Sequence, residues 1–129
     1  MQKTVLIRYI GITEILIGTI TLAATLTVLA LDTNQKPPSV LLFVLTTSIT
    51  SALLGIGILR YKKTAYELLL FFASVIVLSK ILIFMNIIYL TGELETALSP
   101  EFKNCISIIY HSLLFFYLRE PEVKALFVN

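Results

Sequence analysis

Apolar residues dominate four long stretches of the chain, and short polar stretches separate them. The four apolar stretches cover residues 5–31, 38–59, 64–90 and 100–118. A helix needs about 20 apolar residues to cross the hydrocarbon core of a bilayer. The pattern therefore predicts an all-α integral membrane protein with four transmembrane helices.

The shortest stretch, 100–118, begins with residues that favour a helix start. Ser99 can cap the helix, Pro100 tolerates the first helical position, and Glu101 suits the positive end of the helix dipole. At 1.5 Å per residue, a helix over this stretch is about 28 Å long. That length is just enough to cross the hydrocarbon core.

Three short connections join the four stretches, at residues 32–37, 60–63 and 91–99. Short connections make consecutive helices antiparallel neighbours. We therefore expect an up-down-up-down four-helix bundle that forms a single transmembrane domain over residues 1–129.

The residues after Leu118 have a different pattern. Val123, Leu126 and Phe127 are at helical spacing, which predicts a short amphipathic segment lying on the membrane surface. The alternative is a frayed C-terminus.

Composition supports the membrane interpretation. The chain is 57% hydrophobic and only 14% charged, whereas soluble domains carry about 25% charged residues. A soluble chain of this size could not bury so much apolar surface. The net charge of +2 and the absence of a basic run interleaved with aromatics argue against nucleic-acid binding.

The basic residues predict an orientation. Seven would lie on one side of the membrane: Lys3, Arg8, Arg60, Lys62, Lys63, Arg119 and Lys124. Only Lys36 and Lys103 would lie on the other side. Positive residues favour the cytoplasm, so we expect a multi-pass protein of the cell (inner) membrane with both termini cytoplasmic. A cleaved signal peptide over the first stretch is the alternative, but Glu14 interrupts that stretch and it is long for such a peptide.

Small and polar residues form stripes on three of the predicted helices. The stripes are Gly11, Glu14, Gly18, Thr21 and Thr25 in the first, Thr47, Ser51 and Gly55 in the second, and Asn104, Ser107 and His111 in the fourth. Helices in lipid associate through small residues and interhelical hydrogen bonds. We therefore expect the stripes to face each other, with Gly11, Gly18, Thr47, Ser51 and Gly55 as helix-packing residues.

Three ionisable residues, Glu14, Lys80 and His111, fall inside the predicted spans. A charge at the centre of a transmembrane helix costs about 2.5–3.5 kcal/mol on insertion scales. Lys80 and His111 lie close to the middle of their predicted spans, and a lysine side chain is long enough to reach the depth of Glu14. The three either form a structural buried network, or form a polar centre for a proton, ion or substrate with Glu14 as proton acceptor, or never meet.

Residues 10–19 read Ile-Gly-Ile-Thr-Glu-Ile-Leu-Ile-Gly-Thr. This segment resembles the first helix of the small multidrug resistance family. The resemblance implies four short helices and a membrane glutamate, here Glu14, that exchanges protons for cationic drugs. The chain has no tryptophan, so the membrane tryptophan of that family is missing, and Lys80 and His111 have no counterpart in the family pattern.

A second resemblance covers residues 55–66 and 117–127. These segments are similar to parts of small four-helix bacterial inner-membrane proteins that have no assigned activity. This similarity implies the fold and a bacterial inner membrane, and it assigns no functional residue.

Signatures of catalysis are missing from the sequence. The chain has one cysteine, Cys105, and one histidine, His111, which are too few for a disulfide framework or a Cys/His metal site. No Gly-rich loop follows a strand. We therefore expect no enzymatic activity, no metal and no cofactor.

These observations favour an interaction, accessory or scaffold protein of the membrane. Its expected partners are the lipid bilayer and either further copies of itself or another membrane protein. The alternative is a small transporter or proton-coupled channel that uses Glu14, Lys80 and His111.

Overall fold

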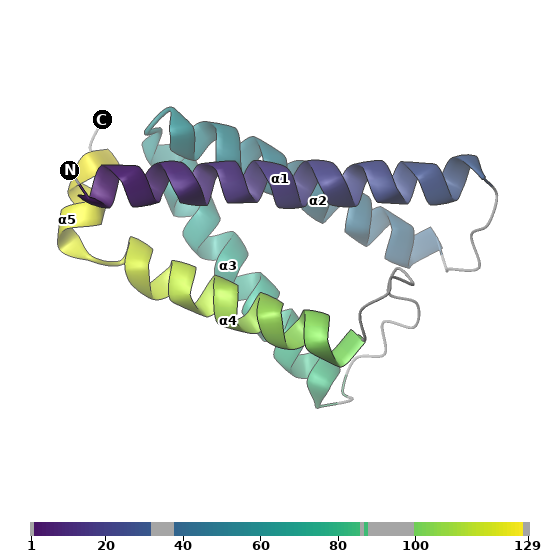
Figure 1. The fold of residues 1–129 in the computed structure, drawn as a ribbon. Coiled ribbons are helices and arrows are strands. Elements are labelled where there is room, and N and C mark those ends of the chain that lie inside the picture. Colours follow the sequence, from purple (N-terminus) through teal and green to yellow (C-terminus); the bar gives the residue numbers. More distant parts are fainter. Residues whose placement is uncertain (1, 32–37, 86, 88–99, 128–129) are drawn as a thin grey trace. The chain divides into compact units, whose positions relative to one another are not determined.

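The computed structural model describes residues 2–31, 38–85, 87 and 100–127. Every regular element in these ranges is helical. The elements are α1 (Gln2–Ala30), α2 (Pro38–Leu59), α3 (Lys63–Phe84), α4 (Pro100–Leu118), α5 (Pro121–Lys124) and the 3-10 turn η1 (Ala125–Phe127) (Figure 1).

The four predicted helical stretches all form helices. The bounds of α2 and α4 agree with the predicted stretches 38–59 and 100–118, and α1 differs from 5–31 by three residues at its start and one at its end. Pro38 and Pro100 are the first residues of α2 and α4, because proline fits the first turn of a helix, where no backbone N–H is needed. The predicted connections 32–37 and 91–99 lie outside the described residues.

The predicted helix 64–90 is too long at its C-terminal end. The structure ends α3 at Phe84, and Met85 has left the helical conformation with φ −78° and ψ 1°. The N–H of Ile87 then donates to the carbonyl of Leu82, five residues back, which closes the helix with a wider turn. Apolar residues continue beyond this point, so hydrophobicity alone does not mark the end.

Three of the helices are long and apolar enough to cross a membrane. They are α1, α3 and the part of α2 from Leu41 to Leu59. The fourth predicted span, α4, is not among them, because Lys103, Asn104 and His111 lower its hydropathy. The structure thus shows an all-helical protein with three helices of membrane-spanning character.

The described chain forms two compact units, one built from α1 and α2 and the other from α3, α4, α5 and η1. In the first unit the two helices are antiparallel and approach very closely. A Cβ atom added at Gly18 would lie 2.5 Å from the carbonyl oxygen of Ser48 and 2.6 Å from the backbone nitrogen of Ala52. At Gly55 it would lie 2.6 Å from the carbonyl oxygen of Gly11. Glycine is therefore required at these contacts.

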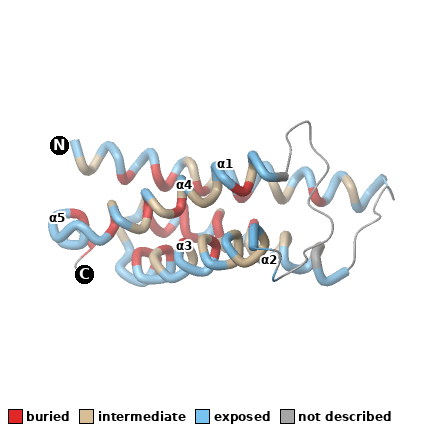
Figure 2. The backbone as a smooth tube through the Cα atoms, turned by 90° about the horizontal axis from the view of Figure 1, so that it is seen from below, coloured by how far each residue is buried: buried red, intermediate tan, exposed pale blue. Residues whose placement is uncertain are grey.

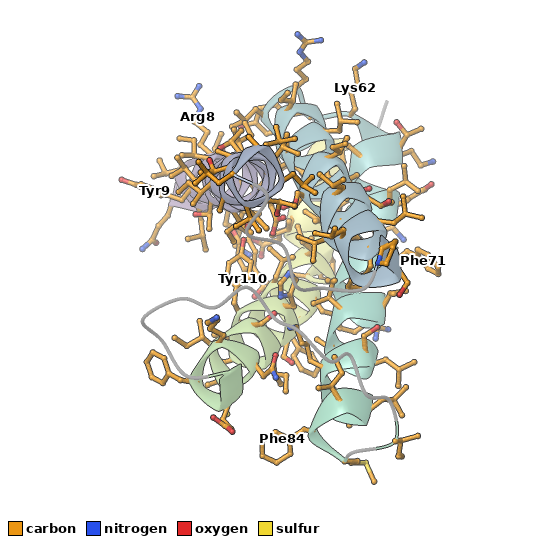
Figure 3. All side chains as sticks on the ribbon, turned by 90° about the vertical axis from the view of Figure 1, so that its right-hand side faces the viewer. Arg8, Tyr9, Lys62, Phe71, Phe84 and Tyr110 are labelled. Atoms are coloured by element: carbon orange, nitrogen blue, oxygen red, sulfur yellow. The ribbon has the colours of Figure 1, made fainter. Side chains whose placement is uncertain are left out.

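The buried positions of α1 recur at a regular spacing (Figure 2). They are Ile7, Ile10, Gly11, Glu14, Gly18 and Thr25. Spacings of three, four and seven residues place most of them on one side of the helix. The opposite side carries large exposed side chains, and Arg8 and Tyr9 project away from the helix axis (Figure 3).

In the second unit, α3 and α4 are also antiparallel. Near the start of α3, the Tyr66 hydroxyl donates to the carbonyl oxygen of Leu118 at 2.8 Å. Near its end, Lys80 Nζ donates to Asn104 Oδ1 at 2.7 Å. The Tyr66 bond satisfies one of the carbonyls that the last turn of a helix leaves without an intrahelical donor.

The C-terminal segment is helical, as predicted, but its apolar side chains are placed differently from the expectation. Val123 and Phe127 are buried, and the Phe127 ring stacks on Tyr66 with centroids 4.9 Å apart. Only Leu126, of the three apolar residues that defined the amphipathic pattern, is exposed. The segment therefore packs on the start of α3 and does not offer its whole apolar face to a membrane surface.

The glycine contacts predict that alanine substitutions in the first unit destabilise it to different extents. Gly18→Ala places its methyl group against backbone atoms, and such overpacking costs about 1–3 kcal/mol, of which helix propensity returns about 1. Gly11→Ala meets Cγ and Cδ2 of the Leu59 side chain at 2.8 Å and the Gly55 carbonyl oxygen at 3.1 Å, so its closest contacts are with a side chain that can shift. We expect Gly18→Ala to lower the unfolding free energy in a detergent titration and Gly11→Ala to change it much less. Equal effects would contradict the close backbone approach at Gly18.

Candidate functional site

Glu14 is the most deeply buried ionisable residue that the structure describes, with 0% of its surface exposed. It lies two residues before the midpoint of α1. Its neighbour is Ser51 of α2, whose Oγ lies 2.6 Å from Glu14 Oε2 and 3.0 Å from the Glu14 carbonyl oxygen. A single hydroxyl thus joins the two helices at both the side chain and the backbone of Glu14.

The hydrogen-bonding pattern between Ser51 and Glu14 depends on how many hydrogens the two side chains carry. A serine hydroxyl has one hydrogen to donate and two lone pairs with which to accept. With a protonated Glu14 carboxyl, the acid O–H donates to Ser51 Oγ, and Ser51 donates to the Glu14 carbonyl oxygen. With a carboxylate, both contacts compete for the one serine hydrogen.

Lys80 lies four residues before the end of α3, and not close to the middle of its span as the sequence pattern predicted. The reason is that α3 ends at Phe84, six residues earlier than expected. Its hydrogen-bond partner Asn104 is buried in the second turn of α4. The amide oxygen of Asn104 thus faces the ammonium group near one end of the α3–α4 pair.

His111 lies two residues beyond the midpoint of α4 and is buried. Its Nδ1 is 2.8 Å from the carbonyl oxygen of Ser107, one turn earlier. The Ser107 hydroxyl oxygen lies 3.3 Å from the same nitrogen, and the tautomer of the ring decides whether Nδ1 donates to the carbonyl or accepts from the hydroxyl. The ring also meets the edges or faces of Tyr110 and Phe72 at centroid distances of 5.0 and 6.4 Å.

The structure brings some of the predicted site residues together. Gly11, Gly18, Ser51 and Gly55 lie in the α1–α2 contact, whereas Thr47 is half-buried and its hydroxyl donates to the Phe43 carbonyl of its own helix at 2.9 Å. Glu14 belongs to the first unit, and Lys80 and His111 belong to the second. The pairing of Glu14 with Lys80 therefore stays a prediction.

Three of the contacts do not follow from the sequence pattern. The polar stripes include Ser51 and Asn104 but do not pair them with Glu14 and Lys80. The stripes also leave out Ser48, which is buried with its carbonyl oxygen against Gly18. The polar stripes predict which face of each helix is buried. Which residue of one helix contacts which residue of the next depends on the register of the two helices.

Within the described ranges, no group of three or more His, Cys, Asp or Glu side chains is arranged to hold a metal ion. No protein-family model, curated protein or solved structure matches this chain.

The Glu14 contact predicts a specific stability loss. Ser51→Ala leaves the buried Glu14 groups without that hydroxyl, and removing one partner of a buried hydrogen bond costs about 1–3 kcal/mol. Ser74→Ala is the matched control, because its exposed hydroxyl only bonds back to the Leu70 carbonyl of its own helix. Unfolding titrations should show a loss for Ser51→Ala and a change below about 0.5 kcal/mol for Ser74→Ala.

The same loss should become smaller when Glu14 is replaced by leucine, because the carboxyl partner is then absent and only the contact with the backbone carbonyl oxygen of residue 14 remains. A double-mutant cycle of Ser51→Ala with Glu14→Leu measures this coupling. A Ser51→Ala effect of the same size in both backgrounds would show that the hydroxyl does not act through the Glu14 side chain.

Proposed function

We propose that this chain is a multi-pass scaffold or accessory protein of the bacterial inner membrane, in which α1 to α4 cross the bilayer as a four-helix bundle. Its partners would be the lipid bilayer and either a second copy of the chain or another membrane protein. The proposal rests on which side chains are exposed and on how the buried polar groups are used.

Large apolar side chains are exposed on all four long helices. Examples are Ile20 of α1, Leu53 of α2, Phe71 of α3 and Phe116 of α4, each between 63% and 69% exposed. Phe84 likewise projects outward from the end of α3 (Figure 3). Exposed apolar surface on every helix is unfavourable in water and favourable in lipid.

The amphipathic character of α4 supports its place as a fourth span. Its inner face carries Asn104 and His111, which are buried, and Phe102, Ile109 and Phe116 are exposed. A helix that turns polar groups toward a neighbouring helix and bulky apolar groups outward can lie in a bilayer despite a lower mean hydropathy.

The scaffold proposal is supported above all by the hydrogen bonds that the polar groups within the proposed spans make between helices. Glu14 is bonded to Ser51 and Lys80 to Asn104, so each joins its helix to the neighbouring one. Interhelical hydrogen bonds of this kind stabilise helix pairs in lipid. Buried polar contacts that tie helices together are what a packing role requires.

Two pairs of basic residues support the proposed orientation. Lys62 directly precedes α3, and Lys63 is the first residue of α3. Arg119 and Lys124 follow the end of α4. Because Tyr66 bonds to Leu118, the start of α3 and the end of α4 lie together. The four basic residues thus flank one end of the helix pair, as expected for its cytoplasmic end.

One observation favours the second candidate, a small transporter or proton-coupled channel that uses Glu14, Lys80 and His111. Glu14 places an ionisable carboxyl, with none of its surface exposed, at the contact between α1 and α2, where Ser51 lies against it. This function requires water to reach Glu14, whereas the scaffold function requires Glu14 to stay dry.

Water access to position 14 separates the two functions. In a chain with Cys105→Ser, a Glu14→Cys variant in lipid vesicles should stay unlabelled by a membrane-impermeant maleimide, because position 14 is wholly buried. Lys62→Cys is the positive control, since Lys62 is exposed and precedes α3. Rapid labelling at position 14 would overturn the scaffold proposal in favour of a water-filled path.

The orientation is tested with the same Lys62→Cys variant in intact bacterial cells. Impermeant maleimide should label it only after the inner membrane is permeabilised, because the connection between α2 and α3 is proposed to be cytoplasmic. Labelling in intact cells would reverse the proposed topology.

A further inference from the structure

The segment Pro121–Phe127, which we call the C-terminal strap, closes one end of the α3–α4 pair. We propose that the strap is a releasable clasp: it docks Phe127 on Tyr66 and Tyr61, and its closed state is opposed by a buried hydroxyl of Tyr61. This inference is independent of the scaffold function, because it concerns only contacts inside the second unit.

The docking rests on two buried side chains. Val123 is 0% exposed and Phe127 is 2% exposed. The Phe127 ring stacks on Tyr66 at 4.9 Å and packs at a tilt on Tyr61 at 5.8 Å between centroids. Tyr66 in turn donates to the Leu118 carbonyl oxygen, so one aromatic group links the strap, α3 and the end of α4.

The strap is built as a unit that can move on a short connection. Glu120 is extended, with φ −59° and ψ 132°, between the end of α4 and the start of α5 at Pro121. The backbone N–H groups of Val123 and Lys124 donate to the Glu120 carbonyl. These bonds lie within the strap and its connection, so they can persist when the strap leaves α3.

Tyr61 lies between α2 and α3 and carries two unfavourable features. Its φ of 52° is left-handed, which is rare for a bulky residue that is not glycine. Its hydroxyl is buried and has no hydrogen-bond partner among the described residues. An unsatisfied buried hydroxyl is unfavourable, and strained residues often occur in elements that switch.

These features together give the strap a two-state character. Docking of Phe127 and Val123 favours the closed state, whereas the Tyr61 hydroxyl favours a state in which water can reach it. Because Phe127 lies on both tyrosine rings, release would expose the rings of Tyr61 and Tyr66 at the end of the helix pair.

Hydrogen–deuterium exchange of the full chain in detergent micelles tests the proposal. Local opening governs the exchange of the strap amides. Phe127→Ala should speed that exchange at least about tenfold, since truncating a buried aromatic ring loses far more than the free energy of a tenfold change. Leu126→Ala is the matched control, because this neighbouring side chain is 41% exposed, and it should change the rate less than about twofold.

Tyr61→Phe gives the decisive comparison, because it removes the hydroxyl and keeps the ring. It should slow strap exchange about fivefold or more, since no unsatisfied group then opposes closure. Unchanged or faster exchange in Tyr61→Phe would overturn the proposal. The proposal would also be overturned if Phe127→Ala speeded exchange in the middle of α4 as much as in the strap, because the strap would then not open as a separate unit.

Discussion

The close approach of the α1 and α2 backbones determines which polar contacts the first helix pair can make. Packed helices are usually separated by 8–10 Å, depending on the side chains at the contact. With glycine at positions 18 and 55, the backbones come near enough for added Cβ atoms to clash with backbone atoms of the other helix. The short side chain of Ser51 can then reach the carbonyl oxygen of Glu14. Glycine packing and the burial of Glu14 are therefore parts of one feature.

The second unit joins its helices in a different way. Two long side chains, those of Tyr66 and Lys80, reach from opposite ends of α3 to groups on α4. Between these two residues, α3 buries Leu69, Ala73 and Ile76. Side chains of this length hold the ends of the helix pair, and the aromatic ring of Phe127 in the C-terminal strap extends the contact beyond α4. The two units thus illustrate backbone contact and side-chain bridging as separate means of pairing apolar helices.

The helix ends were predicted well where a proline or a charged residue stands at the boundary. Pro38 and Pro100 open two helices, and Arg60 and Arg119 follow their last residues. The end of α3 was missed because apolar residues continue past Phe84. The hydrogen-bond partners of polar residues were harder to predict. Adjacent residues on a helix point in directions that differ by about 100°, so a small change in helix rotation changes which residue faces the neighbouring helix. Thr47 and Ser48 are both small hydroxyl residues, and only the packing of α1 against α2 determines that Ser48 faces Gly18.

The early end of α3 also changes where Lys80 lies along its helix. A lysine in the middle of a span needs a partner or a function, but a lysine near a helix end can extend its ammonium group toward the membrane surface. Lys80 lies four residues from Phe84, and its ammonium group donates to Asn104 Oδ1. Glu14 is instead wholly buried near the midpoint of the 29-residue helix α1. Of these two residues, only Glu14 is wholly buried near the middle of its helix, and the Ser51 hydroxyl of α2 is a hydrogen-bond partner that the close α1–α2 approach supplies to it.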